Sequence, residues 1–97
     1  MRVIAKRTLR EFWQKNAQAK RALQAWLEDA ERADWKTQAD IQRTYGDDVI
    51  LPDNRAVFNI KGNHYRLVVK IHYNRGAVYI RFIGTHREYD RVDVLMI

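Results

Sequence analysis

The segment THREYD, from Thr85 to Asp90, brings a histidine, an arginine and a tyrosine close together. A histidine such as His86 can move protons, and Arg87 can hold a phosphate through two parallel hydrogen bonds. A tyrosine such as Tyr89 is ordinarily a weak base, and nearby cations make a phenol a better one because they stabilise its charged form. Such groups can cleave RNA without a metal: one deprotonates the 2′-hydroxyl, cations stabilise the charged transition state, and another protonates the leaving 5′-oxygen.

The same segment also has a structural interpretation. His86 would cap a last helix, Tyr89 would pack its ring on a sheet, and Arg87 would pair with Asp90 or Asp93. On the segment alone this second interpretation is favoured, because polar residues serve packing and ion pairs more often than catalysis. The choice depends on what the preceding strands place beside the segment.

Two alternating segments, HYRLVVKIHY and AVYIRFIG, predict neighbouring strands of an antiparallel sheet. Successive side chains point to opposite faces of a strand, so each strand has one apolar face and one polar face. The apolar face, expected in the core, carries Tyr65, Leu67, Val69, Ile71, Tyr73, Val78, Ile80 and Phe82. The opposite face carries His64, Arg66, Val68, Lys70, His72, Tyr79, Arg81 and Ile83. Cations interleaved with aromatic rings suit RNA binding, and an ordinary solvated sheet face is the alternative.

The first half of the chain predicts the helices that must support this sheet. Val3 and Ile4 open a short strand, and Thr8 with Glu11 has the spacing of a capping box at the start of a first helix. A second helical stripe runs from Ala19 to Ala30, with Asn16 between the two helices. A further short helix is predicted to end at Gly46.

In the second half the apolar pattern changes from helical spacing to strict alternation. RAVFNI, HYRLVVKIHY and AVYIRFIG are separated by short turns rich in Asn and Gly, which predicts a three-strand meander. A last helix is predicted from about His86 to Val94. The expected fold class is α+β: a small, twisted, mainly antiparallel sheet, formed by the N-terminal strand and the meander, with helices packed on one face. We expect residues 1–97 to form a single domain.

Composition limits the partners and cofactors. The net charge is +6, and the excess lies after Asp53, where 8 Lys and Arg face 3 Asp and Glu, against 10 and 9 before. This asymmetry favours an anionic partner, although a basic surface without any partner has the same charge. Cysteines, a membrane-spanning run and a signal-peptide pattern are absent, so we expect a cytoplasmic protein without membrane contact. His64 and His72 lie about 26 Å apart along a strand, so we expect no metal site.

The segments VFNIKGN, YRLVV and THREYD, in this order and spacing, closely resemble the HigB toxins of bacterial type II toxin–antitoxin systems. LREFW and ADWKTQADIQ extend the resemblance over nearly the whole chain. It implies a RelE-like fold and a metal-independent messenger-RNA endoribonuclease, without cofactor, that acts at the ribosomal A site in the bacterial cytoplasm. It also implies neutralisation by a HigA antitoxin with a helix-turn-helix domain, through which alone the toxin would reach operator DNA.

The resemblance also suggests roles for residues. Arg66 matches the strand arginine that contacts the scissile phosphate, and His86 and Tyr89 would transfer protons. Further contacts to RNA phosphates are expected from Lys70, Arg81, Arg87, His64 and His72. ParE-like relatives share the fold but bind DNA gyrase, so a non-catalytic toxin is the alternative function. A degenerate toxin that binds only its antitoxin is a third interpretation.

Overall fold

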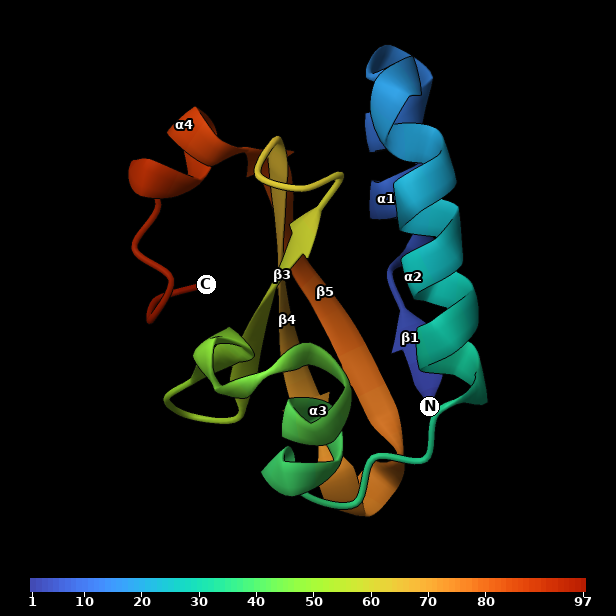
Figure 1. Cartoon of the computed structure of the whole chain (residues 1–97), viewed down its shortest axis with the longest axis vertical. Coiled ribbons are helices and arrows are strands. Elements are labelled where there is room, and N and C mark those ends of the chain that lie inside the picture. The colour runs from blue at the N-terminus through green and yellow to red at the C-terminus, as the bar shows by residue number, and fades with distance from the viewer.

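A computed structural model describes residues 1–97, and a five-stranded sheet forms its centre (Figure 1). The strands are β1 (Arg2–Ile4), β2 (Ile50–Leu51), β3 (Arg55–Ile60), β4 (Tyr65–His72) and β5 (Ala77–Thr85). Their order is β1-β5-β4-β3-β2, with β1 parallel to β5 and the other pairs antiparallel. The predicted N-terminal strand and meander are confirmed, and the short β2 is an edge strand that the sequence did not reveal.

Three helices cover one face of the sheet, and a fourth lies on the other side. α1 (Lys6–Lys15), α2 (Lys20–Arg32) and α3 (Gln38–Tyr45) contribute buried side chains to the core beneath the sheet. α4 (His86–Asp90) and the residues after it lie on the opposite side, as Figure 1 shows. None of these helices is both long enough and apolar enough to span a bilayer. The α+β prediction is confirmed, with α4 as the one helix outside the main layer.

α1 begins earlier than the sequence predicted. Its N-cap is Ala5, whose φ of 72° is left-handed, and no side chain caps this helix. Thr8 lies within the helix, and Glu11 pairs with Arg7 at 2.6 Å. The predicted capping box is therefore wrong, because its first residue must lie outside the helix. The pairing of β1 ends at Ile4, so the chain turns at once and the helix begins before Thr8 is reached.

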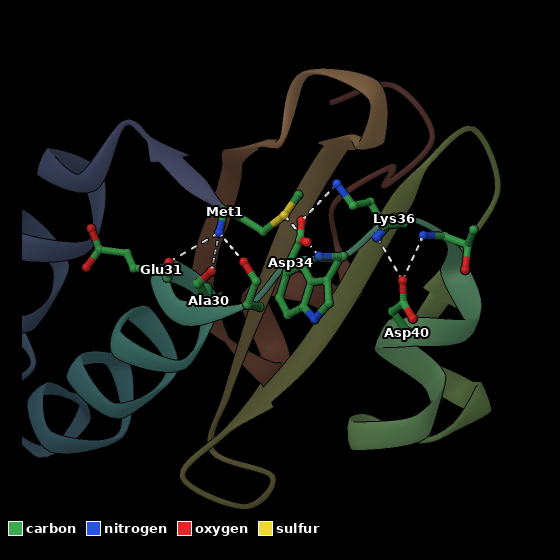
Figure 2. Close-up of polar contacts among 9 residues, drawn as sticks. Met1, Ala30, Glu31, Asp34, Lys36 and Asp40 are labelled. Atoms are coloured by element: carbon green, nitrogen blue, oxygen red, sulfur yellow. Dashed lines mark hydrogen bonds and ion pairs between the residues drawn. The ribbon is translucent and has the colours of Figure 1, made fainter.

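A capping box does begin α3. Thr37 is the N-cap, and the Asp40 carboxylate accepts hydrogen bonds from the backbone nitrogens of Lys36 at 2.8 Å and of Thr37 at 3.1 Å (Figure 2). These two bonds lower the pKa of the Asp40 carboxyl, since they favour its charged form. Gly46, with a φ of 95°, ends the helix as predicted.

The amino end of the chain is held at the end of α2 (Figure 2). The Met1 ammonium donates hydrogen bonds to the carbonyl oxygens of Ala30 at 3.0 Å, of Glu31 at 3.2 Å and of Ala33. The last carbonyls of a helix have no partner within it and carry partial negative charge, so a cation is favourable there. These bonds hold β1 beside α2.

The core lies between the three long helices and the sheet. Its centre is Phe58 of β3, which is 2% exposed and contacts the rings of Trp26, Trp35 and Tyr45. Burial raises the pKa of the Tyr45 hydroxyl, and the charge of Asp29 raises it further. Burying several rings together supplies much of the apolar stabilisation available to so short a chain.

The β4–β5 pairing contains a β-bulge that changes the predicted faces. Val69 pairs with Ile80 but Val68 pairs with Phe82, so Arg81 has no partner of its own. One extra residue reverses the alternation beyond it. The prediction that Phe82 faces the core is therefore wrong: Phe82 lies on the face opposite the long helices. Ile83 packs against the core instead.

Candidate functional site

The predicted chemical groups gather where α4 leaves the sheet, a place that we call the α4 corner. His64, Arg66, His86, Arg87 and Tyr89 define it. The backbone nitrogen of His86 donates a hydrogen bond to the carbonyl of His64 at 3.1 Å, which joins the start of α4 to the turn before β4. Arg66 lies directly across from Gly84, the residue before Thr85. Residues from two distant segments of the sequence thus meet at one end of the sheet.

The start of α4 is fixed by its own capping box. The Glu88 nitrogen donates to the Thr85 hydroxyl at 3.1 Å, and the Thr85 nitrogen donates to the Glu88 carboxylate at 2.8 Å. α4 ends at Asp90 rather than at the predicted Val94, because the Val92 nitrogen bonds to the Tyr89 carbonyl in a tighter turn. Thr85 and Glu88 therefore do the capping.

This cap separates the two interpretations of THREYD. His86 does not cap α4; its Nδ1 lies 3.2 Å from an Asp90 carboxylate oxygen, and its side chain is about half exposed. Arg87 is exposed and pairs with neither Asp90 nor Asp93. Tyr89 is half-buried against Phe82, with ring centroids 6.4 Å apart. The structural interpretation is confirmed only for Tyr89, so His86 and Arg87 remain open to a ligand.

The arginines of the α4 corner and of the bulge have no carboxylate partner. The Arg66 guanidinium makes only long contacts, to the Asn63 backbone and side-chain oxygens at 3.4 Å and to the Tyr65 carbonyl at 3.3 Å. Arg81 and Arg87 form no ion pair and are exposed. Cations without a carboxylate partner add to a local positive potential, which favours a polyanion.

Lys70 and His72 lie at the other end of β4, away from the α4 corner. Lys70 is four residues from Arg66, which is about 13 Å along a strand. Its Nζ lies 3.3 Å from the Asp53 carboxylate, so its charge is already partly compensated. The His72 ring packs edge-on against Tyr79, with centroids 4.7 Å apart. The predicted set thus divides into a cluster at the α4 corner, Arg81 at the bulge, and two outlying residues.

Arg55 is a polar residue that the sequence analysis missed. It is only 7% exposed, and it donates to the Asp53 carboxylate at 2.9 Å and to the Ile97 carbonyl at 2.9 Å. The Arg55 hydrogen bond is the main cause that lowers the pKa of the Asp53 carboxyl, followed by Lys70. The sequence signal that could have identified Arg55 is its position at the start of an alternating strand, directly after the Asp-Asn turn. Arg55 holds the last residues of the chain against the sheet.

The α4 corner is an open surface rather than a cavity. A groove of about 400 Å³ lies on the helix side between α2, α3 and β3, and none of the predicted site residues lines it. No three His, Asp or Glu side chains are arranged to hold a metal ion. An open, cationic surface with an imidazole and a phenol can bind a polymer and transfer protons.

The five-stranded mixed sheet with four helices is compatible with the fold of RelE-like toxins. A family model of the HigB toxins, described as the RelE-like toxic component of a toxin-antitoxin system, matches residues 19–92, and the chain belongs to this family. Comparison with curated proteins gives no match. The matched range contains the α4 corner and both outlying residues. The chain is therefore a toxin with an antitoxin partner, as the resemblance predicted.

Proposed function

We propose that this toxin is a messenger-RNA endoribonuclease that cuts at the ribosome in the bacterial cytoplasm. The observation that supports it is the α4 corner: Arg66 and Arg87 have no acidic partner and lie with His86 and Tyr89 on an open surface. Membership in the RelE-like toxins also supports a nuclease activity. The antitoxin would be of the HigA type, with a helix-turn-helix domain that also carries the complex to operator DNA.

The proposed reaction is an internal transfer at one phosphate. A base removes the proton of the 2′-hydroxyl, the 2′-oxygen attacks the adjacent phosphorus, and the bond to the 5′-oxygen breaks as an acid protonates it. The products are a 2′,3′-cyclic phosphate and a free 5′-hydroxyl. His86 and Tyr89 are the candidates for base and acid, and Arg66 stabilises the charge that develops on the phosphate oxygens. Arg81 and Arg87 hold neighbouring phosphates.

Ribosome dependence is proposed because the α4 corner is an open surface and not a cleft that could enclose the messenger. An open face with few ordering contacts does not by itself place a flexible messenger for in-line attack, and orientation contributes much of the rate. The ribosome would supply that order by holding the codon. The α4 corner faces solvent, so a decoding site can reach it.

The test is translation in vitro of a defined messenger, with and without ribosomes, followed by mapping of the cut ends. We expect cuts in register with codons, 2′,3′-cyclic phosphate ends, and little cleavage when ribosomes are omitted. Uncut messenger together with DNA damage in cells would favour the gyrase-binding alternative. Cleavage of free RNA at the full rate would remove ribosome dependence but keep the nuclease.

Alanine variants test the site residues. Arg66→Ala, His86→Ala and Tyr89→Ala should each abolish growth arrest, because each removes a charge or a proton carrier from the reaction. Arg75→Ala is the matched control, since Arg75 is exposed in the turn at the opposite end of β4 and β5. If all three site variants stay folded and fully toxic, the assignment of these residues is wrong.

A further inference from the structure

The β-bulge at Arg81 places Phe82 on the face opposite the long helices, where strict alternation along β5 would have placed Ile83. Val68 and Phe82 are paired, and both lie on the face opposite the long helices. Without the bulge Phe82 would enter the core and Ile83 would lie on this face. Val68 is fully buried there, although the core of the long helices is on the other side. The bulge thus creates a small apolar platform beside Arg66.

Gly84 provides the space for the Phe82 ring. A Cβ built on Gly84 would lie 2.6 Å from Cζ of Phe82, closer than real Cβ atoms approach a neighbour, and it would also be crowded by Glu88 Oε1 at 3.1 Å and Phe82 Cε2 at 3.2 Å. Gly84 is buried, and its backbone is not in the left-handed region, so its conformation alone does not require glycine. The ring therefore lies directly on the backbone of β5, which fixes its height above the sheet.

The Phe82 ring also contacts α4 at Tyr89. Their ring centroids lie 6.4 Å apart at an interplanar angle of 50°, a normal geometry for a pair of aromatic rings. α4 has only five residues, and an isolated helix of that length is not stable in water. Its first turn is held by the Thr85 cap, and the Phe82 contact reaches Tyr89 in its last turn. Phe82 is therefore placed to set where the Tyr89 side chain lies.

We propose that Phe82, turned onto this face by the bulge and with its ring placed over Gly84, is a positioning residue that holds the Tyr89 phenol at the α4 corner for RNA cleavage. The inference rests on the proposed function. It goes beyond that function because Phe82 carries no proton and no charge, and acts only through Tyr89. Gly84 takes part because it has no side chain that would displace the Phe82 ring.

The test measures single-turnover cleavage on ribosomes, with the rate at saturation separated from the half-saturating concentration. Phe82→Leu keeps apolar volume but removes the ring, and Gly84→Ala forces the ring to move. Because a misplacement of about 1 Å can cost about 100-fold in rate, we expect a loss of about 10- to 100-fold with half-saturation unchanged. Antitoxin binding should stay close to that of the unmodified chain, and Phe82→Leu should stay folded, whereas crowding at Gly84→Ala should lower its unfolding temperature.

A double-mutant cycle separates positioning from simple destabilisation. If Phe82 acts through Tyr89, Phe82→Leu should have no further effect on the residual rate of Tyr89→Phe. Phe12→Leu is the matched control: Phe12 is also half-buried and contacts a tyrosine, Tyr65, at 5.4 Å, but on the helix side. It should leave cleavage unchanged in both backgrounds.

The outcomes are distinct. Equal losses from Phe82→Leu in the two backgrounds, or a change in half-saturation alone, would overturn the positioning role while the nuclease stands. An unmodified chain that never cuts messenger would refute the proposed function, and the inference with it. Misfolding of Gly84→Ala would leave Phe82→Leu to decide.

Discussion

Replacing Asp53 by asparagine should strengthen RNA binding, because the Asp53 carboxylate pairs with Lys70 and compensates its positive charge. The Asp53 carboxylate lies 3.3 Å from Lys70 Nζ and 2.9 Å from an Arg55 guanidinium nitrogen. Asn keeps an oxygen that can accept the Arg55 hydrogen bond, and it tolerates the φ of 60° found at this position. The substitution removes the negative charge that compensates both Arg55 and Lys70 but keeps the turn. Arg55 is buried and keeps its bond to Ile97, so Lys70 is the cation that becomes available to RNA.

The size of the effect follows from counterion release. Each cation that neutralises a phosphate of single-stranded nucleic acid adds about 0.7 to the slope of log affinity against log salt. If Lys70 alone is freed, Asp53→Asn should steepen the slope by about 0.7. A fourfold rise in salt should then cost the variant about 2.6-fold more affinity than it costs the unmodified chain. At low salt the variant should bind more tightly.

The assay is fluorescence anisotropy of a short labelled single-stranded RNA titrated at several salt concentrations. Asp34→Asn is the matched control, because it makes the same change in net charge and frees Lys36, its partner at 3.2 Å in the connection between α2 and α3. We expect the control slope to stay unchanged. Equal slopes for the two variants would show that net charge, and not Lys70, explains any gain, and the reasoning would be refuted.

Three further predictions concern stability and α4. Phe58→Ala should lower the free energy of unfolding by about 3–5 kcal/mol in a denaturant titration, because it empties the centre of the aromatic core. Thr85→Ala should cost about 1 kcal/mol through loss of the α4 cap, and should lower cleavage while Thr8→Ala leaves it unchanged. Burial raises the pKa of Tyr45 above its unfolded value of 10.0, so its contribution to stability is complete below pH 10 and is lost as pH rises through the folded pKa. Tyr45→Phe should therefore make the denaturant midpoint less sensitive to alkaline pH, and an unchanged dependence would contradict this cause.

Much of the sheet could be predicted because alternation and turn residues act locally. Leu67, Val69 and Ile71 are buried in the core, while Arg66 and Lys70, which point to the opposite face of β4, are partly exposed, as the pattern predicted. The turns rich in Asn and Gly lie between the strands as expected. Local rules of this kind need no knowledge of which segments meet, and they therefore succeed within one hairpin.

The parts that could not be predicted depend on contacts between distant segments. The bulge arises from how β4 and β5 match each other, so counting along β5 alone placed Phe82 in the core. The pairing of Lys70 with Asp53 joins residues 17 positions apart, so the cation expected to be free is partly compensated. The bond between His86 and His64, which creates the α4 corner, also crosses a complete hairpin.

The departures from simple packing rules concentrate in one place. The end of β5 combines a bulge, a strand glycine crowded by the Phe82 ring and the Glu88 carboxylate, and a helix too short to form alone. Arg66 and Arg87 lie there without an acidic partner, whereas Lys70, at the other end of β4, has one. Proteins tolerate such local costs where function requires them, because selection for folding alone would remove them. The distribution of these features, more than the identity of any single residue, favours the α4 corner as the place of chemistry.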